Sequence, residues 1–368
     1  DYNLGLGALS LIKNIRLLDG RTELSALRNP AQYLFFKNAN RSNAINLSND
    51  SYLKRHGIGY EIAEDTNKIT NVHPSGKADT ATDTTHLAYL DLREVFPILN
   101  SLRVLPTQLF PNLKIEIEFN PKAKEILADV SVAITPQRPV LAVDIINNDV
   151  LVNQEINAIA KAGVVWDEIE WDSFVIPEVD TTAYTATEVK TQNVSNQSLG
   201  YRGKYVERLL ICKQLQNIAL GLNGNDQVGF GGIAPSQSFV NQTTQYRLNG
   251  KNVLPGFNGI TGENERLGVL SDEWGSVNSY PGSNLYQWNR GTENMEGAGV
   301  FNGAMSWDCV RLGARVADLQ INISRVNNSD TSAKSATNDG IVCNLYAEVK
   351  KAMALGASAG SAYRIVYA

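Results

Sequence analysis

The run Phe110-Pro-Asn-Leu113-Lys-Ile-Glu-Ile-Glu-Phe119 carries the clearest structural pattern in this 368-residue chain. From Leu113 onward, apolar residues alternate with charged ones, which is the period of a β-strand with one buried face and one exposed face. Similar alternation predicts strands at 130–134, 140–146, 319–324 and 341–350, with a short final strand at 363–367 that ties this end into a sheet. Strands therefore dominate the chain.

Glycine-containing turns place two further strand boundaries. Asn249-Gly250 lies between two strand-like arms, and both residues tolerate the positive φ angles of a type I′ hairpin turn. This register pairs Tyr246 with Val253. The stretch 200–204 lacks the length and the Ser/Thr of a phosphate-binding loop, so it is expected to be a turn that enters a strand at 205–213.

Helices are expected to be few and short. Asp91 and Glu94 form a capping-box pattern, and Pro97 limits the helix that follows to one or two turns. A second helix is predicted at 153–162 with Gly163 as its stop, and a third at 263–274. Residues 4–18 are mildly amphipathic and are expected to form a helix, an arm or an ordinary packing segment.

Composition narrows the classes of function. Only 19% of residues are charged, the net charge is −5, and no segment is strongly basic. The chain therefore lacks the positive surface that non-specific nucleic-acid binding needs. Long polar stretches at 64–86, 222–244 and 276–306 are expected to be loops that contact neighbouring molecules. No run approaches the roughly 20 apolar residues of a membrane span.

The three cysteines, Cys212, Cys309 and Cys343, all lie in apolar or strand-like runs without metal-ligand spacing. They are expected to be buried free thiols in a reducing compartment, with one disulfide plus one free thiol as the alternative. The three histidines, His56, His73 and His86, have no helical partner at metal-ligand spacing. No metal, cofactor or catalytic residue is predicted.

The most enzyme-like feature is the acidic strand at 167–172. Glu168, Glu170 and Asp172 fall on one face of a strand, with neighbours about 7 Å apart. The favoured interpretation is a solvated face or a polar contact between subunits. Two alternatives are a glycoside hydrolase using Glu168 and Glu170, with Trp166 and Trp171 stacking on sugar, and a calcium site.

Two stretches resemble double jelly-roll major capsid proteins of tailless icosahedral DNA viruses. One is Tyr89 to Asn100 followed by Phe110 to Phe119, and the other combines 319–324, 343–348 and 363–367. The lineage includes tectiviruses, adenovirus hexon, virophages and polinton-like viruses. The resemblance covers about a third of the chain directly, and it rests on a pattern of strands and turns with no signature motif.

The resemblance implies an all-β chain of two consecutive eight-stranded antiparallel jelly rolls with a few short helices and long loops. The expected division is an N-terminal arm at 1–20, a first jelly roll at 21–180 and a second at 181–368, with a seam near 176–200. Antiparallel sandwiches give each strand one apolar and one polar face, in agreement with the observed alternation.

The implied role is structural, with no enzymatic activity. Three copies would form a pseudo-hexagonal capsomer in the virion shell, made and assembled inside the host cell. The expected partners are the chain itself, neighbouring capsomers, penton and minor capsid proteins, and an internal membrane through the N-terminal arm. A carbohydrate-binding attachment protein, with Tyr280, Tyr286 and Trp288 exposed, is the first alternative, and the glycoside hydrolase is the second.

Overall fold

The structure of the chain is a computed structural model. The structure describes residues 12–30, 33–34, 60–62, 69–71, 90–119, 138–177, 191–215, 242–254, 256, 258–261, 269, 307–326, 341–355 and 363–368.

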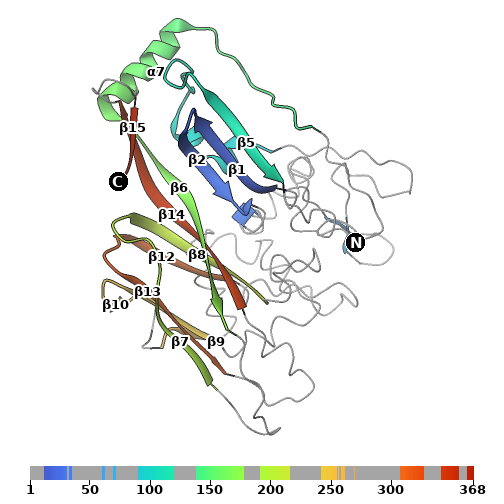
Figure 1. The fold of residues 1–368 in the computed structure, drawn as a ribbon, viewed down its shortest axis with the longest axis vertical. Helices are drawn as coiled ribbons and strands as arrows, with labels where there is room; N and C mark the ends of the chain where they lie inside the picture. The colour runs from blue at the N-terminus through green and yellow to red at the C-terminus, as the bar shows by residue number, and fades with distance from the viewer. Residues whose placement is uncertain are drawn as a thin grey trace.

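Three antiparallel sheets contain nearly all of the described strands (Figure 1). The first sheet has the order β2 (Thr22–Arg28), β1 (Ile12–Asp19), β5 (Leu113–Phe119). The central sheet comprises β6 (Val164–Ile176), β8 (Tyr205–Leu215), β12 (Trp307–Arg315), β14 (Ile341–Leu355) and β15 (Tyr363–Tyr367). The third sheet comprises β7 (Thr191–Ser198), β9 (Gln242–Leu248), β10 (Lys251–Asn252), β11 (Ile260–Thr261) and β13 (Leu319–Val326). A separate pair joins β3 (Tyr60–Ile62) to β4 (Ile69–Asn71).

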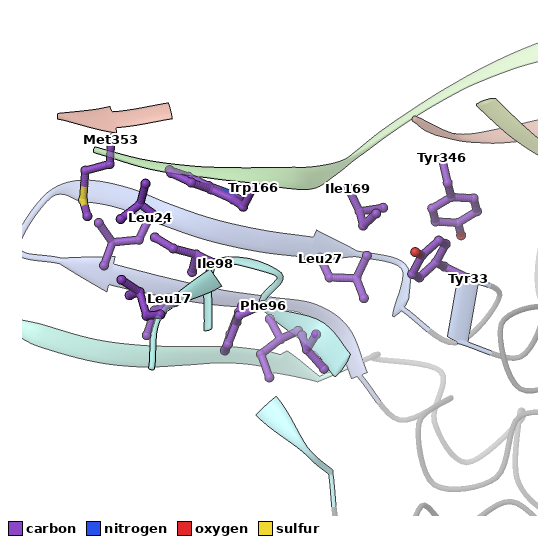
Figure 2. Close-up of a cluster of buried hydrophobic side chains, with 14 of the residues drawn as sticks. Leu17, Leu24, Leu27, Tyr33, Phe96, Ile98, Trp166, Ile169, Tyr346 and Met353 are labelled. Atoms are coloured by element: carbon purple, nitrogen blue, oxygen red, sulfur yellow. The ribbon is translucent and has the colours of Figure 1, made fainter. Parts of the chain in front are cut away.

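The central sheet is buried on both faces, and this makes the molecule a stack of three layers (Figure 1). Along β8, Leu210 and Cys212 pack into the core shared with the first sheet, whereas Leu209 and Ile211 pack into the core shared with the third sheet. Figure 2 shows Trp166 and Ile169 of β6 lying over Leu24 and Leu27 of β2. Two separate hydrophobic cores therefore stabilise one central layer.

β14 is the longest described strand and organises the central sheet. One edge pairs with β6 from Ile341 to Met353. The other edge pairs first with β8 and then, beyond a register shift at Glu348/Val349, with β15. The prediction that 363–367 ties into a sheet is confirmed.

Three helices are described, and the first and third have side-chain caps at their N-termini. Asp91 accepts a hydrogen bond from the Arg93 N–H at the start of α4 (Leu92–Val95), and α5 (Ile98–Ser101) follows Pro97. Asn148 caps α7 (Asp149–Ala162), which ends at Gly163 with φ +70°. α7 therefore begins four residues before the predicted start at 153. The helix predicted at 263–274 lies outside the described residues except for Val269.

Most of the expected strands are present. The patterns at 113–119, 205–213, 319–324 and 341–350 correspond to β5, β8, β13 and β14. The hairpin is also confirmed, because Asn249 and Gly250 have φ angles of 51° and 82° and the Val253 N–H donates to the Tyr246 carbonyl. The prediction of a mostly β chain with few short helices is thus confirmed. Two complete eight-stranded rolls remain a prediction, and the strand predicted at 130–134 lies outside the described residues.

One local expectation was wrong. Residues 140–146 form no strand, because their backbone has no hydrogen-bonding strand beside it among the described residues. Residues 12–19, expected to be part of a helix, an arm or an ordinary packing segment, form β1, the middle strand of the first sheet. Within the seam expected near 176–200, residues 191–198 form β7, which pairs with β13. The domain boundaries stay a prediction, and β6 and β14, from the two predicted halves, pair in one sheet.

Candidate functional site: the acidic strand and the sheet contacts

The acidic strand forms the middle of β6, and its three carboxylates have different surroundings. Glu168 is buried, Glu170 is half-buried and Asp172 is exposed. The alternation of β6 breaks at the consecutive buried residues Glu168 and Ile169. The three side chains therefore do not form a uniformly solvated face.

Glu168 joins the central sheet to the first sheet. Its side chain is 1% exposed. One carboxylate oxygen accepts hydrogen bonds from Ser25 Oγ and the Ala26 N–H of β2, both at 2.9 Å. The other oxygen accepts from Trp166 Nε1 at 2.7 Å. The expectation of a solvated strand face was wrong for this residue, because β2 covers it.

Burial raises the pKa of Glu168 above its usual value, because removal from water penalises the charged form. The positive charge of Lys351 and the three hydrogen bonds act in the opposite direction without cancelling the effect of burial. A buried carboxylate that accepts three hydrogen bonds is costly to leave unpaired, so its partners fix the position of β2 over β6.

Two tyrosines add further contacts between the same layers. Tyr346 Oη, from β14, donates to the Asn29 carbonyl at 2.9 Å, and Tyr363 Oη, from β15, donates to Asp19 at 2.8 Å. Burial raises the pKa of both phenols. Polar groups thus fix the alignment of layers that hydrophobic burial holds together.

Glu170 joins β6 to β15 and to the turn before β8. Its carboxylate contacts Lys204 Nζ at 2.5 Å and accepts a hydrogen bond from Tyr367 Oη at 2.8 Å. Lys204 Nζ also lies 4.6 Å from the centre of the Tyr367 ring, within cation–π range. Burial, followed by the bond to Glu170, raises the pKa of Tyr367. The cluster holds the last described strand in place.

Replacing Tyr367 by phenylalanine tests this cluster. The ring and its contact with Lys204 remain, while Glu170 loses one hydrogen-bond donor. Because Tyr367 is 45% exposed, water can partly replace the lost donor. We expect a loss of about 0.5–1 kcal/mol in the free energy of unfolding, measured by urea denaturation. A loss above about 2 kcal/mol would contradict this description of the cluster.

The geometry disfavours sugar hydrolysis by the acidic strand. Glu168 has its hydrogen bonds within the protein, and Trp166, which was expected to stack on sugar, is 3% exposed. Asp172 accepts from the backbone N–H of its neighbour Ser173. Within the described ranges, no three His, Cys, Asp or Glu side chains are grouped closely enough to hold a metal ion.

The central and third sheets also meet through buried polar groups. Thr244 Oγ1 of β9 donates to Asp308 of β12 at 3.1 Å. Beside it, Gln245 donates from Nε2 to the carbonyls of Leu254 and Gly256 and accepts at Oε1 from the N–H groups of Tyr246 and Leu254. Sequence reasoning missed both contacts. The only signal in the sequence was the polar run Thr243-Thr244-Gln245 at the start of a strand.

Some of the remaining candidates lie within the described residues and others lie outside them. Cys212, Cys309 and Cys343 are buried thiols that form no disulfide bond, as predicted. The turn at 200–204 leads into β8, with Gly203 at φ +84°. The histidines, Tyr280, Tyr286 and Trp288 lie outside the described residues. No helix in the described part of the chain has the length and apolar character needed to cross a membrane.

No protein-family model matches the sequence, and no curated protein matches it. Among solved structures, the chain is similar over its full length to 86% of a chain in the quasi-atomic model of the PBCV-1 virus capsid, with a TM-score of 0.46 and 10% identity. PBCV-1 VP54, fitted into a reconstruction of the virophage Sputnik, gives a TM-score of 0.44 at 10% identity over 87% of its chain. A chain of the Sputnik virophage structure itself gives a TM-score of 0.43 at 8% identity over 76% of its length.

Proposed function

We propose that this chain is a structural protein of a virus capsid, a double jelly-roll block of which three copies form a pseudo-hexagonal capsomer. The observation that carries the proposal is the central sheet, which is buried on both faces between two antiparallel sheets. Its buried polar groups Glu168 and Asp308 bond to neighbouring layers. Such a stack resists bending and shear, as a repeating subunit of a capsid must.

The same arrangement supports the absence of enzymatic activity in this proposal. Carboxylates that act in catalysis must reach a substrate, and Glu168 is covered by β2. The proposed partners are further copies of the chain, neighbouring capsomers, and penton and minor capsid proteins in the virion. Contacts between capsomers are expected to be individually weak and repeated by symmetry, whereas the interface within the trimer is expected to be large.

The solution mass of the full chain tests this proposal. Native mass spectrometry is expected to give a species of about 121 kDa, three times the 40.2 kDa of one chain, that persists on dilution. A single 40.2 kDa species at all concentrations would overturn the trimeric block. Binding to a glycan array by such a monomer would favour the attachment-protein alternative.

A further inference from the structure

An exposed arm, defined here as residues 138–148, leads into α7 along the outside of the molecule (Figure 1). Its backbone is extended and makes no backbone hydrogen bond to the described residues before the Asn148 carbonyl. Val140, Val143 and Ile145 are 92%, 68% and 87% exposed, and Leu141 and Ile146 are also exposed. Asp144 is the only charged residue between 139 and 148.

Such a segment is unfavourable in an isolated molecule. Contiguous apolar surface exposed to water marks a contact with another molecule, and unpaired N–H and C=O groups of an extended chain form a template for strand pairing. The apolar residues at 140–146, where we expected a strand, are therefore consistent with a strand whose partner lies outside this molecule.

The edge of β5 matches this segment in length and pattern. Among the described strands, β5 pairs only with β1, so its other edge carries no described partner. Leu113, Ile115 and Ile117 are only partly buried against the core of the first two layers. By contrast, β7, another edge strand in the described part of the chain, reads TQNVSNQS and offers a single apolar side chain.

We infer that residues 140–146 of one copy add as an antiparallel strand to the β5 edge of a second copy. In one register, Asp144 lies opposite Lys114, which brings the only charge of the segment beside an opposite charge. The same register places Leu141, Val143 and Ile145 on the face of Ile117, Ile115 and Leu113, respectively. These three apolar residues of the arm thereby extend the partly covered edge of the core.

The anchoring of α7 favours a second copy over the chain's own β5. Ile159 of α7 is buried in the core, and Gly163 packs against the Met353 carbonyl of β14. Figure 1 shows the arm leaving this anchored helix and passing outside β5. At about 3.3 Å per residue, the eleven residues span roughly 36 Å, more than the radius of gyration of roughly 21 Å expected for a chain of this length. This inference rests on the proposed function, in which the neighbours of each subunit include identical chains.

Proline substitution tests the main-chain pairing. Successive N–H groups of a strand point to opposite edges, so the double variant Ala142→Pro/Val143→Pro removes one ladder hydrogen bond whichever edge faces β5. Neither N–H donates to another described backbone group in the isolated chain, so folding should be preserved. Native mass spectrometry over a dilution series is expected to show the variant dissociating to the 40.2 kDa species at a higher protein concentration than the unmodified chain does. Asn147→Pro, in the same arm but beyond the paired register, is the matched control and should keep the multimer.

Cysteine cross-linking tests the register. Mixing Asp144→Cys protein with Lys114→Cys protein under mild oxidation is expected to give a disulfide-linked dimer of two different chains. Both positions are exposed, and the three native cysteines are buried. Glu118→Cys is the control partner, because it lies four residues further along β5, about 13 Å away. Equal cross-linking to positions 114 and 118 would overturn the register.

The outcomes separate this inference from the proposed function. A multimeric unmodified chain whose proline variant dissociates over the same concentration range would overturn the arm contact and leave the capsid proposal standing. A monomeric unmodified chain would overturn the proposed trimer. A disulfide formed within one chain of the Asp144→Cys/Lys114→Cys double variant, without linked dimers, would show that the arm closes on its own β5 and would also overturn the inference.

Discussion

Replacing Gly259 by alanine is expected to destabilise the protein by about 4 kcal/mol or more, enough to disrupt the third sheet. A Cβ atom at this position would lie 1.9 Å from the Thr244 carbonyl oxygen, and the φ angle of +91° is unfavourable for any side chain. Thr244 is fully buried and bonds to Asp308, so the backbone at this point has little freedom to move away. Urea denaturation followed by circular dichroism would measure the loss.

Gly250→Ala is the matched control for this substitution. Its φ angle of +82° is similar, but a Cβ there would meet no atom within 4 Å. The control therefore carries only the conformational strain of about 1–2 kcal/mol. A similar loss in both variants would show that the backbone relaxes around position 259, which would contradict the close packing of β11 against β9.

Replacing Glu168 by alanine is expected to destabilise the protein by about 3 kcal/mol. Ser25 Oγ, the Ala26 N–H and Trp166 Nε1 would all lose their buried acceptor, at a cost of about 1–3 kcal/mol for each unsatisfied group. Removing the buried charge offsets part of this loss. Chemical denaturation at neutral pH measures the difference in the free energy of unfolding.

Glu168→Gln separates the effect of charge from the effect of hydrogen bonding. Its amide keeps the size of the side chain, but one carboxylate oxygen becomes an NH₂ group, so at least one of the three donors loses its acceptor. Glutamine does not titrate, so the stability difference between this variant and the unmodified chain reports the titration of Glu168. We expect a smaller loss than for alanine at neutral pH.

The pH dependence of that difference follows from the raised pKa of Glu168. Because the folded-state pKa lies above the unfolded value, near 4.5, protonation favours the folded state. This contribution is fully present below the unfolded pKa and is lost as the pH rises through the folded pKa. Relative to Glu168→Gln, the unmodified chain should therefore lose stability as the pH rises above about 4.5. A difference that stays constant with pH would contradict the burial of Glu168.

Local patterns in the sequence were sufficient to predict β5, β13, β14 and the hairpin at Asn249-Gly250. In each case the alternation or the turn chemistry is complete within a few neighbouring residues, and the fold preserves it. The same logic located the end of α7 at Gly163 but not its start, because Asn148 provides the cap before the apolar positions begin to repeat.

The surroundings of the acidic strand could not be predicted in this way. One of the hydrogen bonds that Glu168 accepts comes from Ser25, which is 143 positions away in the chain. No sequence pattern around Ser25 marks it as the donor. Alternation along β6 predicts similar exposure for Glu168, Glu170 and Asp172. In the structure, the consecutive residues Glu168 and Ile169 are both buried. Residues 140–146 show the converse case, since alternation predicts a strand without revealing whether a partner is present.

The position of β14 between β6 and β8 has a consequence for biosynthesis. Residues 164–176 and 205–215 leave the ribosome well before residue 341, yet in the folded chain they are joined through the strand that begins there. Contacts between residues so distant in sequence slow folding and leave apolar strand faces uncovered while translation continues. Chaperone binding during synthesis is therefore expected to be strongest for nascent chains that end before Ile341. Incomplete chains would also be kept out of any assembly, because the central sheet is complete only when β14 pairs with β6 and β8.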